Sequence, residues 1–163
     1  MKILGIIDED IVNYKKCSMY IAFPYCTFKC GKENCQNKEL ENAPLIEVGV
    51  EEVCERYLNN PITEAIVFGG LEPLDSGFEI MELIDHLRRI HECEDDIVVY
   101  TGYTEDELNN LEFIKLNALY KNICKYPNII IKFGRYIPNQ EPHFDKVLGI
   151  NLISNNQYGK RVS

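Results

Sequence analysis

The sequence contains no long apolar run, and none of its hydrophobic stretches approaches the roughly 18 residues that a membrane-spanning helix needs. Its first segment turns acidic at Asp8, before the apolar core of a secretory signal peptide could form. Basic residues are also few, since 17 lysines and arginines face 26 acidic residues and the net charge is −9. We therefore expect a cytoplasmic protein that binds neither a membrane nor, as its main partner, nucleic acid.

Internal repeats, low-complexity tracts and a recognisable interdomain linker are absent as well. The 163 residues are 45% hydrophobic and 26% charged, which is ordinary for a globular chain that buries one core. We therefore expect residues 1–163 to form a single domain.

Cysteine, in contrast, is plentiful. The chain has seven cysteines, and without a secretion signal they are expected to stay reduced. Reduced cysteines in this number favour metal or redox chemistry over a disulfide framework. Three of them, Cys26, Cys30 and Cys35, share one short loop directly after an apolar run. This spacing is typical of a loop that holds a metal ion or an iron–sulfur cluster.

Three thiolates leave a tetrahedral metal or a cubane cluster one ligand short, and an open position is what a reactive site needs. An iron–sulfur cluster held in this way would keep one iron free for a substrate. Zinc is an equal alternative, with Cys17, nine residues before Cys26, as the candidate fourth ligand. The loop alone leaves both alternatives open.

Hydrophobic periodicity predicts strands that alternate with helices. Strands are expected at residues 2–7, 18–24, 64–68, 96–101 and 128–133, and the tail from Gly134 is expected to be irregular. One helix is expected over residues 50–60. Two more should begin at capping boxes, Ser76–Glu79 and Thr104–Glu107, the second helix running to about Cys124. The alternation indicates an α/β fold with a mostly parallel sheet.

A second candidate loop, Gly69-Gly-Leu-Glu-Pro73, follows the strand expected at residues 64–68. Ligands of α/β proteins gather at the carboxyl ends of strands, so we expect this loop and the cysteine loop to form one site. The paired glycines expose backbone amides and carbonyls. Together with the carboxylate of Glu72, these groups could hold the ammonium group of an amino-acid-like ligand.

The chain resembles the radical S-adenosylmethionine (SAM) activases of anaerobic ribonucleotide reductase. Four of its segments match segments of that family, and they occur in the same order along the chain. The first two segments are the cysteine motif, which ends at Asn37, and the glycine motif from Gly69 to Pro73. The other two are Tyr100–Leu108 and the stretch from Gly149 to Gln157. The chain departs from the usual family pattern in having four residues, rather than two, between the second and third cysteines, and an extra leucine in the glycine motif.

The resemblance implies an incomplete, TIM-like barrel of the radical SAM type and an oxidoreductase that uses a [4Fe-4S] cluster on Cys26, Cys30 and Cys35. SAM would be cleaved to a 5′-deoxyadenosyl radical, which installs a glycyl radical on anaerobic ribonucleoside-triphosphate reductase. Reduced flavodoxin or ferredoxin would be the electron donor. The residues implied to contact SAM are Asn34, Gln36, Asn37, Gly69, Gly70, Glu72, Pro73 and Tyr103. No catalytic residue beyond the cluster and SAM is required, because the cofactors carry the chemistry.

Between residues 14 and 38, five lysines face one acidic residue, so the cysteine region is locally positive. If the resemblance holds, Lys15, Lys16, Lys29 and Lys32 could dock an acidic electron carrier. Two alternatives stay open. The target could be another glycyl-radical enzyme, or the chain could be a non-catalytic iron–sulfur or zinc module that does not cleave SAM.

Overall fold

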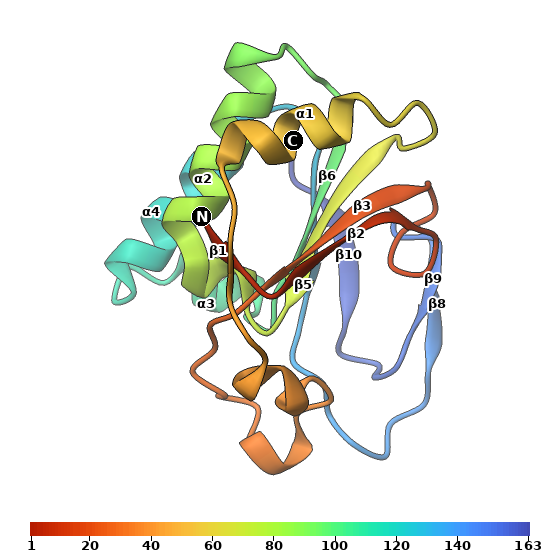
Figure 1. Cartoon of the computed structure of the whole chain (residues 1–163). Helices are drawn as coiled ribbons and strands as arrows, with labels where there is room; N and C mark the ends of the chain where they lie inside the picture. Colours follow the sequence, from red (N-terminus) through yellow and green to blue (C-terminus); the bar gives the residue numbers. More distant parts are fainter.

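A six-stranded sheet forms the centre of the computed structural model, which describes residues 1–163 (Figure 1). Its strands follow the order β10-β7-β6-β5-β3-β2. Their bounds are β2 Gly5–Asp10, β3 Ser18–Phe23, β5 Ala65–Gly70, β6 Asp96–Tyr100, β7 Ile129–Phe133 and β10 Tyr158–Arg161. The four central strands, β3, β5, β6 and β7, run parallel, whereas β2 and β10 pair antiparallel at the two edges.

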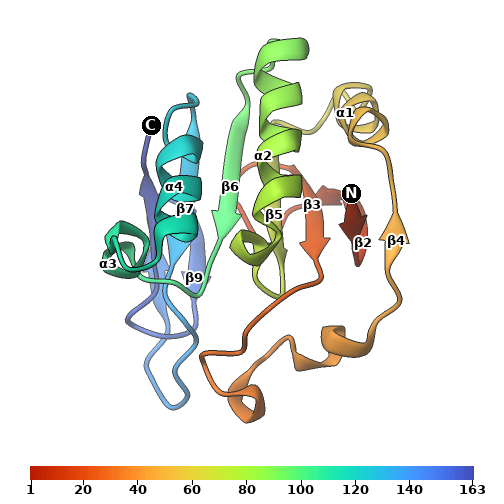
Figure 2. The same cartoon turned by 90° about the vertical axis from the view of Figure 1, so that its left-hand side faces the viewer.

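Short helices cover one face of the sheet, and Figure 2 looks onto this layer, with α2 and α4 in front of the central strands. The helices are α1 Val50–Leu58, α2 Gly77–Asp85, α3 Glu105–Asn109 and α4 Ile114–Ile123, and α2 continues into one π-helical turn, His86–Ile90. The other face carries a small hairpin of β8 (His143–Asp145) and β9 (Ile150–Leu152) (Figure 1). No helix combines the length and the apolar character that a bilayer crossing would require.

Side chains of β5 alternate between two hydrophobic clusters, because successive residues of a strand point to opposite faces. Ile66 and Phe68 belong to the larger cluster, between the sheet and the helices. Ala65 and Val67 belong to a smaller cluster that includes Leu148 from the hairpin region. The central strands are therefore buried on both faces, which explains why their sequences are almost continuously apolar.

The strands expected from periodicity are all present, and the helix expected over residues 50–60 is α1. The first strand, however, is divided at Leu4 into β2 and a short β1 (Lys2–Ile3), which pairs with β4 (Ile46–Glu47). Three of the five strand pairs in the large sheet are parallel, so the sheet is mixed. The α/β class agrees with expectation, whereas the incomplete barrel and the single domain stay predictions.

The expectation of an irregular tail was wrong, because the residues after Gly134 contribute β8, β9 and β10. These strands are only three or four residues long, and β10 is mostly exposed, so local periodicity gave no signal for them. Long-range pairing with β7 is what fixes β10, and a single-sequence pattern does not contain that information.

One of the two expected capping boxes is present. Thr104 accepts a hydrogen bond from the backbone N–H of Glu107, whose side chain accepts one from the backbone N–H of Thr104. The helix that follows is shorter than expected, because Asn110 is extended and α4 begins anew at Ile114. The box at Ser76 is not formed, since a 3₁₀ turn leads directly into α2 and the Ser76 hydroxyl makes no capping hydrogen bond.

A cluster of charges surrounds the buried carboxylate of Asp96 at the amino end of the sheet. The carboxylate of Asp96 lies 2.7 Å from Lys16 Nζ and 2.7 Å from an Arg161 nitrogen, and it accepts a hydrogen bond from the Tyr14 hydroxyl at 3.0 Å. Burial raises the pKa of Asp96, but these hydrogen bonds outweigh burial, so the pKa lies below its ordinary value. The cluster thereby ties the segment before β3 and strand β10 to the start of β6.

Replacing this carboxylate should destabilise the fold. We expect Asp96→Ala to lower the free energy of unfolding by about 2–3 kcal/mol, because hydrogen bonds to a charged group are lost and the buried Tyr14 hydroxyl is left without its acceptor. Urea denaturation measures the difference. Glu94→Ala is the matched control, since Glu94 is an exposed acid two residues away, and it should change stability by less than about 0.5 kcal/mol. Equal effects of the two changes would contradict this role for Asp96.

Candidate functional site

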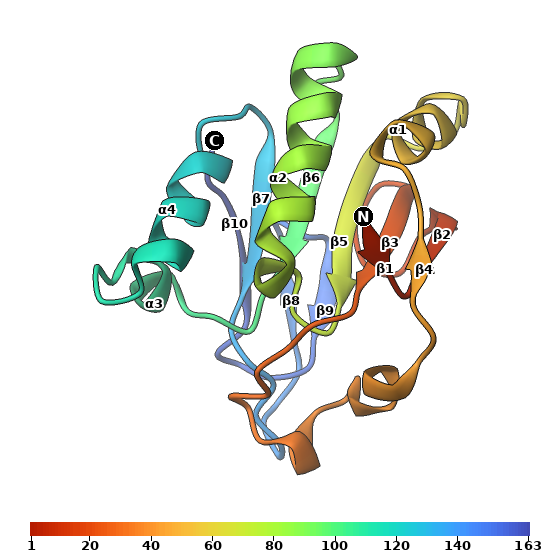
Figure 3. The same cartoon turned by 60° about the vertical axis from the view of Figure 1, so that its left-hand side comes forward.

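A cavity of about 370 Å³ opens at the carboxyl ends of the four parallel strands. The cavity forms here because the cysteine loop after β3 and the segments that follow β7 lie at the same end of the sheet (Figure 3). Residues of the loops after β5 and β6 line the cavity as well. The residues expected from the sequence that line this cavity are Cys26, Cys30, Cys35, Gln36, Asn37, Gly69, Gly70, Glu72 and Tyr103. Two loops that are about 40 residues apart in the sequence therefore share one site, as the strand-end rule suggested.

Two expected contact residues lie outside the cavity lining. Asn34 belongs to a short 3₁₀ turn between the second and third cysteines, where its side chain donates a hydrogen bond to Glu33 at 3.3 Å. Pro73 is buried at the start of the 3₁₀ turn that follows Glu72. A direct contact of either residue with SAM stays a prediction.

The three cysteines share the cavity, and no group of three or more cysteine, histidine or acidic side chains is yet arranged to hold a metal ion. Burial raises the pKa of the Cys26 thiol to about 11, although its sulfur accepts a hydrogen bond from the Phe28 backbone N–H at 3.2 Å. Burial also raises the pKa of Cys30, and the nearby Arg135 guanidinium acts in the opposite direction. A metal that binds here must therefore displace protons from the thiols.

Cys17 is not available as a fourth ligand. It precedes β3, whereas the three other cysteines follow β3, and its backbone carbonyl accepts a hydrogen bond from Glu64 at the amino end of the sheet. Six residues of strand separate the two ends by roughly 20 Å. The zinc site with Cys17 that the sequence left open does not form in this fold.

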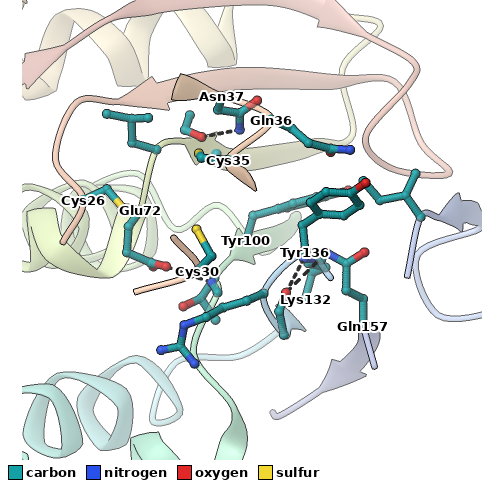
Figure 4. A pocket seen from close by; sticks show the side chains of 18 of the residues that line it. Cys26, Cys30, Cys35, Gln36, Asn37, Glu72, Tyr100, Lys132, Tyr136 and Gln157 are labelled. Carbon is teal, nitrogen blue, oxygen red and sulfur yellow. Dashed lines mark hydrogen bonds between the residues drawn. The ribbon is translucent and has the colours of Figure 1, made fainter. Parts of the chain in front are cut away.

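Both glycines of the second loop are required by close contacts. A Cβ atom on Gly69 would lie 2.4 Å from the Tyr20 hydroxyl oxygen. Gly70 has a φ of +93°, and a Cβ there would lie 2.6 Å from the backbone nitrogen and oxygen of Phe23. The Gly70 carbonyl accepts a hydrogen bond from the Asn37 side chain at 2.7 Å, so the end of the cysteine motif is tied to the glycine loop (Figure 4).

The carboxylate of Glu72 joins two loops. One oxygen accepts the backbone N–H of Gly102 at 2.8 Å and the other accepts that of Leu74 at 3.2 Å. Burial raises the pKa of Glu72 to about 7, and the Gly102 N–H moderates this rise. The side chain was expected to hold a ligand ammonium group, but its nearest partners here are backbone amides. Its role in the structure is to join the ends of β5 and β6 beside the cavity.

Several residues that line the cavity were not among the expected site residues, namely Lys132, Tyr136 (both in Figure 4) and Arg135. Gln157, the last residue of the fourth matching segment, lines the cavity as well (Figure 4). Lys132 is buried, donates a hydrogen bond to the Gly134 carbonyl at 2.8 Å, and has its pKa lowered to about 8 by burial. A signal for it existed, because a lysine within the apolar strand Ile129–Phe133 is unusual. The strand-end rule would also have pointed to the segment after β7.

Lysines that are close in the sequence do not form one basic patch. Lys16 pairs with Asp96 at the amino end of the sheet, away from the cysteine loop. Lys32 pairs with Glu41, and Lys29 Nζ lies over aromatic rings beside the cavity. The positive region expected from the sequence is thus divided between the two ends of the sheet.

Three cysteines at one cavity of an α/β fold are typical of a metal- or cluster-binding protein. The particular family follows from a match of residues 15–150 to the model of the 4Fe-4S single cluster domain. The match covers most of the chain, and the chain belongs to this family. No curated protein and no solved structure is significantly similar to it. The family supports an iron–sulfur protein over the zinc alternative.

The residues of the cavity fit a cluster of this kind by the chemistry of their donor set. Cys26, Cys30 and Cys35 come from one loop and line one cavity, so they can supply three thiolate ligands. No other cysteine lines the cavity, so a cluster of four irons would have one iron without a cysteine ligand.

Gly70 gives a direct test of the loop geometry. We expect Gly70→Ala to lower the free energy of unfolding by at least about 2 kcal/mol, because its positive φ and the Phe23 backbone leave no room for a Cβ. Gly5→Ala is the matched control, since nothing lies within 4 Å of a Cβ built there. Urea denaturation of both variants measures the difference. Equal stability of the two variants would contradict the geometry described for Gly70.

Glu72 should make stability depend on pH. Its folded pKa of about 7 lies above its ordinary value of 4.5, so its contribution is complete below that ordinary value and is lost as pH rises through 7. Between about pH 5 and pH 7, the wild type should lose stability relative to Glu72→Gln, with a slope of up to about 1.4 kcal/mol per pH unit. Urea denaturation at several pH values measures this slope. Parallel curves for the two proteins would contradict the raised pKa.

Proposed function

We propose that this chain is a radical SAM oxidoreductase that installs a glycyl radical on anaerobic ribonucleoside-triphosphate reductase. One observation carries the proposal. Each of the four segments of the resemblance contributes residues to the same cavity, although they extend from Cys26 to Gln157 in the sequence. Membership of a 4Fe-4S family gives independent support for the cluster.

In this proposal, Cys26, Cys30 and Cys35 would hold the cluster and leave one coordination position for SAM. When bound, the cluster would supply the electron for reductive cleavage of SAM to methionine and a 5′-deoxyadenosyl radical, which would take hydrogen from the target glycine. The chain itself binds and orients SAM and excludes water. The hairpin would exclude water from the cavity, because Ile150 and Leu152 of β9 line it.

The charges of the cavity suit a zwitterionic ligand such as the methionine part of SAM. Glu72 provides a carboxylate, and Lys132 and Arg135 provide cations that line the same cavity. The glycine loop and Glu72 would orient the methionine end. The adenosyl end would lie along Gln36 and Asn37, with Asn34 as a further proposed contact.

The proposal extends to the fold and to the partners. The four parallel strands, with helices on one face only, would represent the incomplete barrel of the radical SAM type within a single domain. The partners would be the glycyl-radical enzyme and reduced flavodoxin or ferredoxin. Another glycyl-radical enzyme as the target requires no change in the site.

A second candidate is a non-catalytic iron–sulfur module that does not cleave SAM. One observation favours it: four residues separate Cys30 from Cys35, whereas the activase pattern has two. The same experiment separates both candidates.

The experiment is anaerobic reconstitution with iron and sulfide, followed by reduction with dithionite in the presence of SAM. We expect the wild type to form 5′-deoxyadenosine, measured by chromatography, and Cys30→Ala to form none above background, because one cluster ligand is missing. Cys124→Ala is the matched control, since this cysteine is half-buried at the end of α4 and does not line the cavity. It should behave as the wild type.

The outcomes distinguish the candidates. A cluster that forms but never cleaves SAM would identify the non-catalytic module, and absence of any cluster would refute the iron–sulfur site. If SAM is cleaved, the reductase is added and the glycyl radical is sought by electron paramagnetic resonance. Cleavage without that radical would point to another glycyl-radical enzyme as the target.

A further inference from the structure

Two cationic side chains make cation–π contacts with the ring of Tyr103. Lys29 Nζ lies 4.9 Å and Arg135 Cζ 5.3 Å from the ring centroid. The ring is held in place because its hydroxyl donates a hydrogen bond to Asp75 at 3.0 Å. Cations within about 6 Å of an aromatic ring are attracted to its face. Lys29, Tyr103 and Arg135 all line the cavity of the three cysteines, and we name them the cation wall.

Arg135 is restrained from several directions. Its guanidinium makes two hydrogen bonds to the Glu107 carboxylate, at 2.8 and 2.9 Å, a bidentate geometry that fixes orientation as well as distance. Glu107 is itself fixed by the capping box at the start of α3. The Arg135 carbonyl accepts a hydrogen bond from the Asn156 side chain at 2.8 Å. The turn before β10 therefore positions the backbone of Arg135, and Glu107 of α3 positions its guanidinium group.

The other cation of the wall belongs to the cysteine loop. Lys29 immediately precedes Cys30 in the sequence and has no carboxylate partner within ion-pair distance, in contrast to Lys32, which is paired with Glu41. Lys29 Nζ also lies 4.8 Å from the Phe113 ring centroid. The cation wall thus holds one positive charge with a carboxylate partner and one without, beside the same thiols.

We propose that Lys29 and Arg135, held on the Tyr103 ring, stabilise the reduced form of the iron–sulfur cluster bound by the cysteine loop. A [4Fe-4S] cluster with three thiolates carries one net negative charge when oxidised, and one electron adds a second. A fixed positive charge near the cluster stabilises the more negative state more strongly. The cation wall would therefore raise the reduction potential of the cluster. This inference rests on the cluster-binding part of the proposed function and does not depend on SAM cleavage.

The test is the midpoint potential of the reconstituted cluster, measured without SAM by dithionite titration and electron paramagnetic resonance. Arg135→Gln and Lys29→Gln should each shift the potential to more negative values. Glu107→Gln should shift it to more positive values, because the charge of Arg135 is then no longer balanced. The double variant Arg135→Gln/Glu107→Gln should lie between the two single variants. Arg89→Gln is the control, since Arg89 is exposed and paired with Asp85 outside the cavity, and it should have the wild-type potential.

Opposite shifts from the two partners of one ion pair exclude general loss of structure as the cause, because structural damage would not reverse its sign. Equal potentials in the wild type, Arg135→Gln and Glu107→Gln would overturn the inference, whether or not SAM is cleaved. A wild-type chain that binds no cluster would overturn both the cysteine assignment and this inference. The expected order of potentials in a protein that does not cleave SAM would support the inference and refute only the activase.

Discussion

The parallel pairing of β3, β5, β6 and β7 is the constraint on which the rest of this structure depends. Parallel strands bring their carboxyl ends to one edge of a sheet, and the register here aligns Phe23 with Gly70. The cysteine loop and the glycine loop are therefore neighbours wherever else the chain runs. Helices cover only one face, so the other face is left to the C-terminal hairpin, which supplies one wall of the cavity. Closing the sheet edges with β2 and β10 needs only antiparallel pairing and no further crossover.

Polar groups at this edge are buried, and the fold has to compensate each of them. Glu72 is satisfied by two backbone amides from different loops, and Lys132 by the carbonyl of Gly134. Arg135 has Glu107 as its partner, which also caps α3. Glu72 and Arg135 therefore also connect the loops that form the cavity. Chemistry and architecture are coupled at this edge, so a change to one of these residues affects both.

Much of the fold could be predicted from local patterns. The central strands are apolar because both of their faces are buried, and the capping box at Thr104 satisfies its partners within one turn. Patterns failed where distant contacts decide, because strand β10 is defined by its pairing with β7. They also failed at Ser76, which does not cap α2 because a 3₁₀ turn leads directly into that helix. The cysteine and glycine loops could be assigned to one site, since a general property of α/β folds places strand ends together.

By itself the sequence determined the donor chemistry, namely three closely spaced thiols after an apolar strand, and the α/β alternation that carries them. Only the tertiary structure decided which charges accompany those thiols. Lys16 and Lys29 are 13 residues apart in the sequence, yet Lys16 pairs at the amino end of the sheet and Lys29 lies at the carboxyl end. Arg135, more than 100 residues from Cys30, lines the same cavity. The physical reason is that a charge acts through distance in space, and the pairing of strands sets that distance.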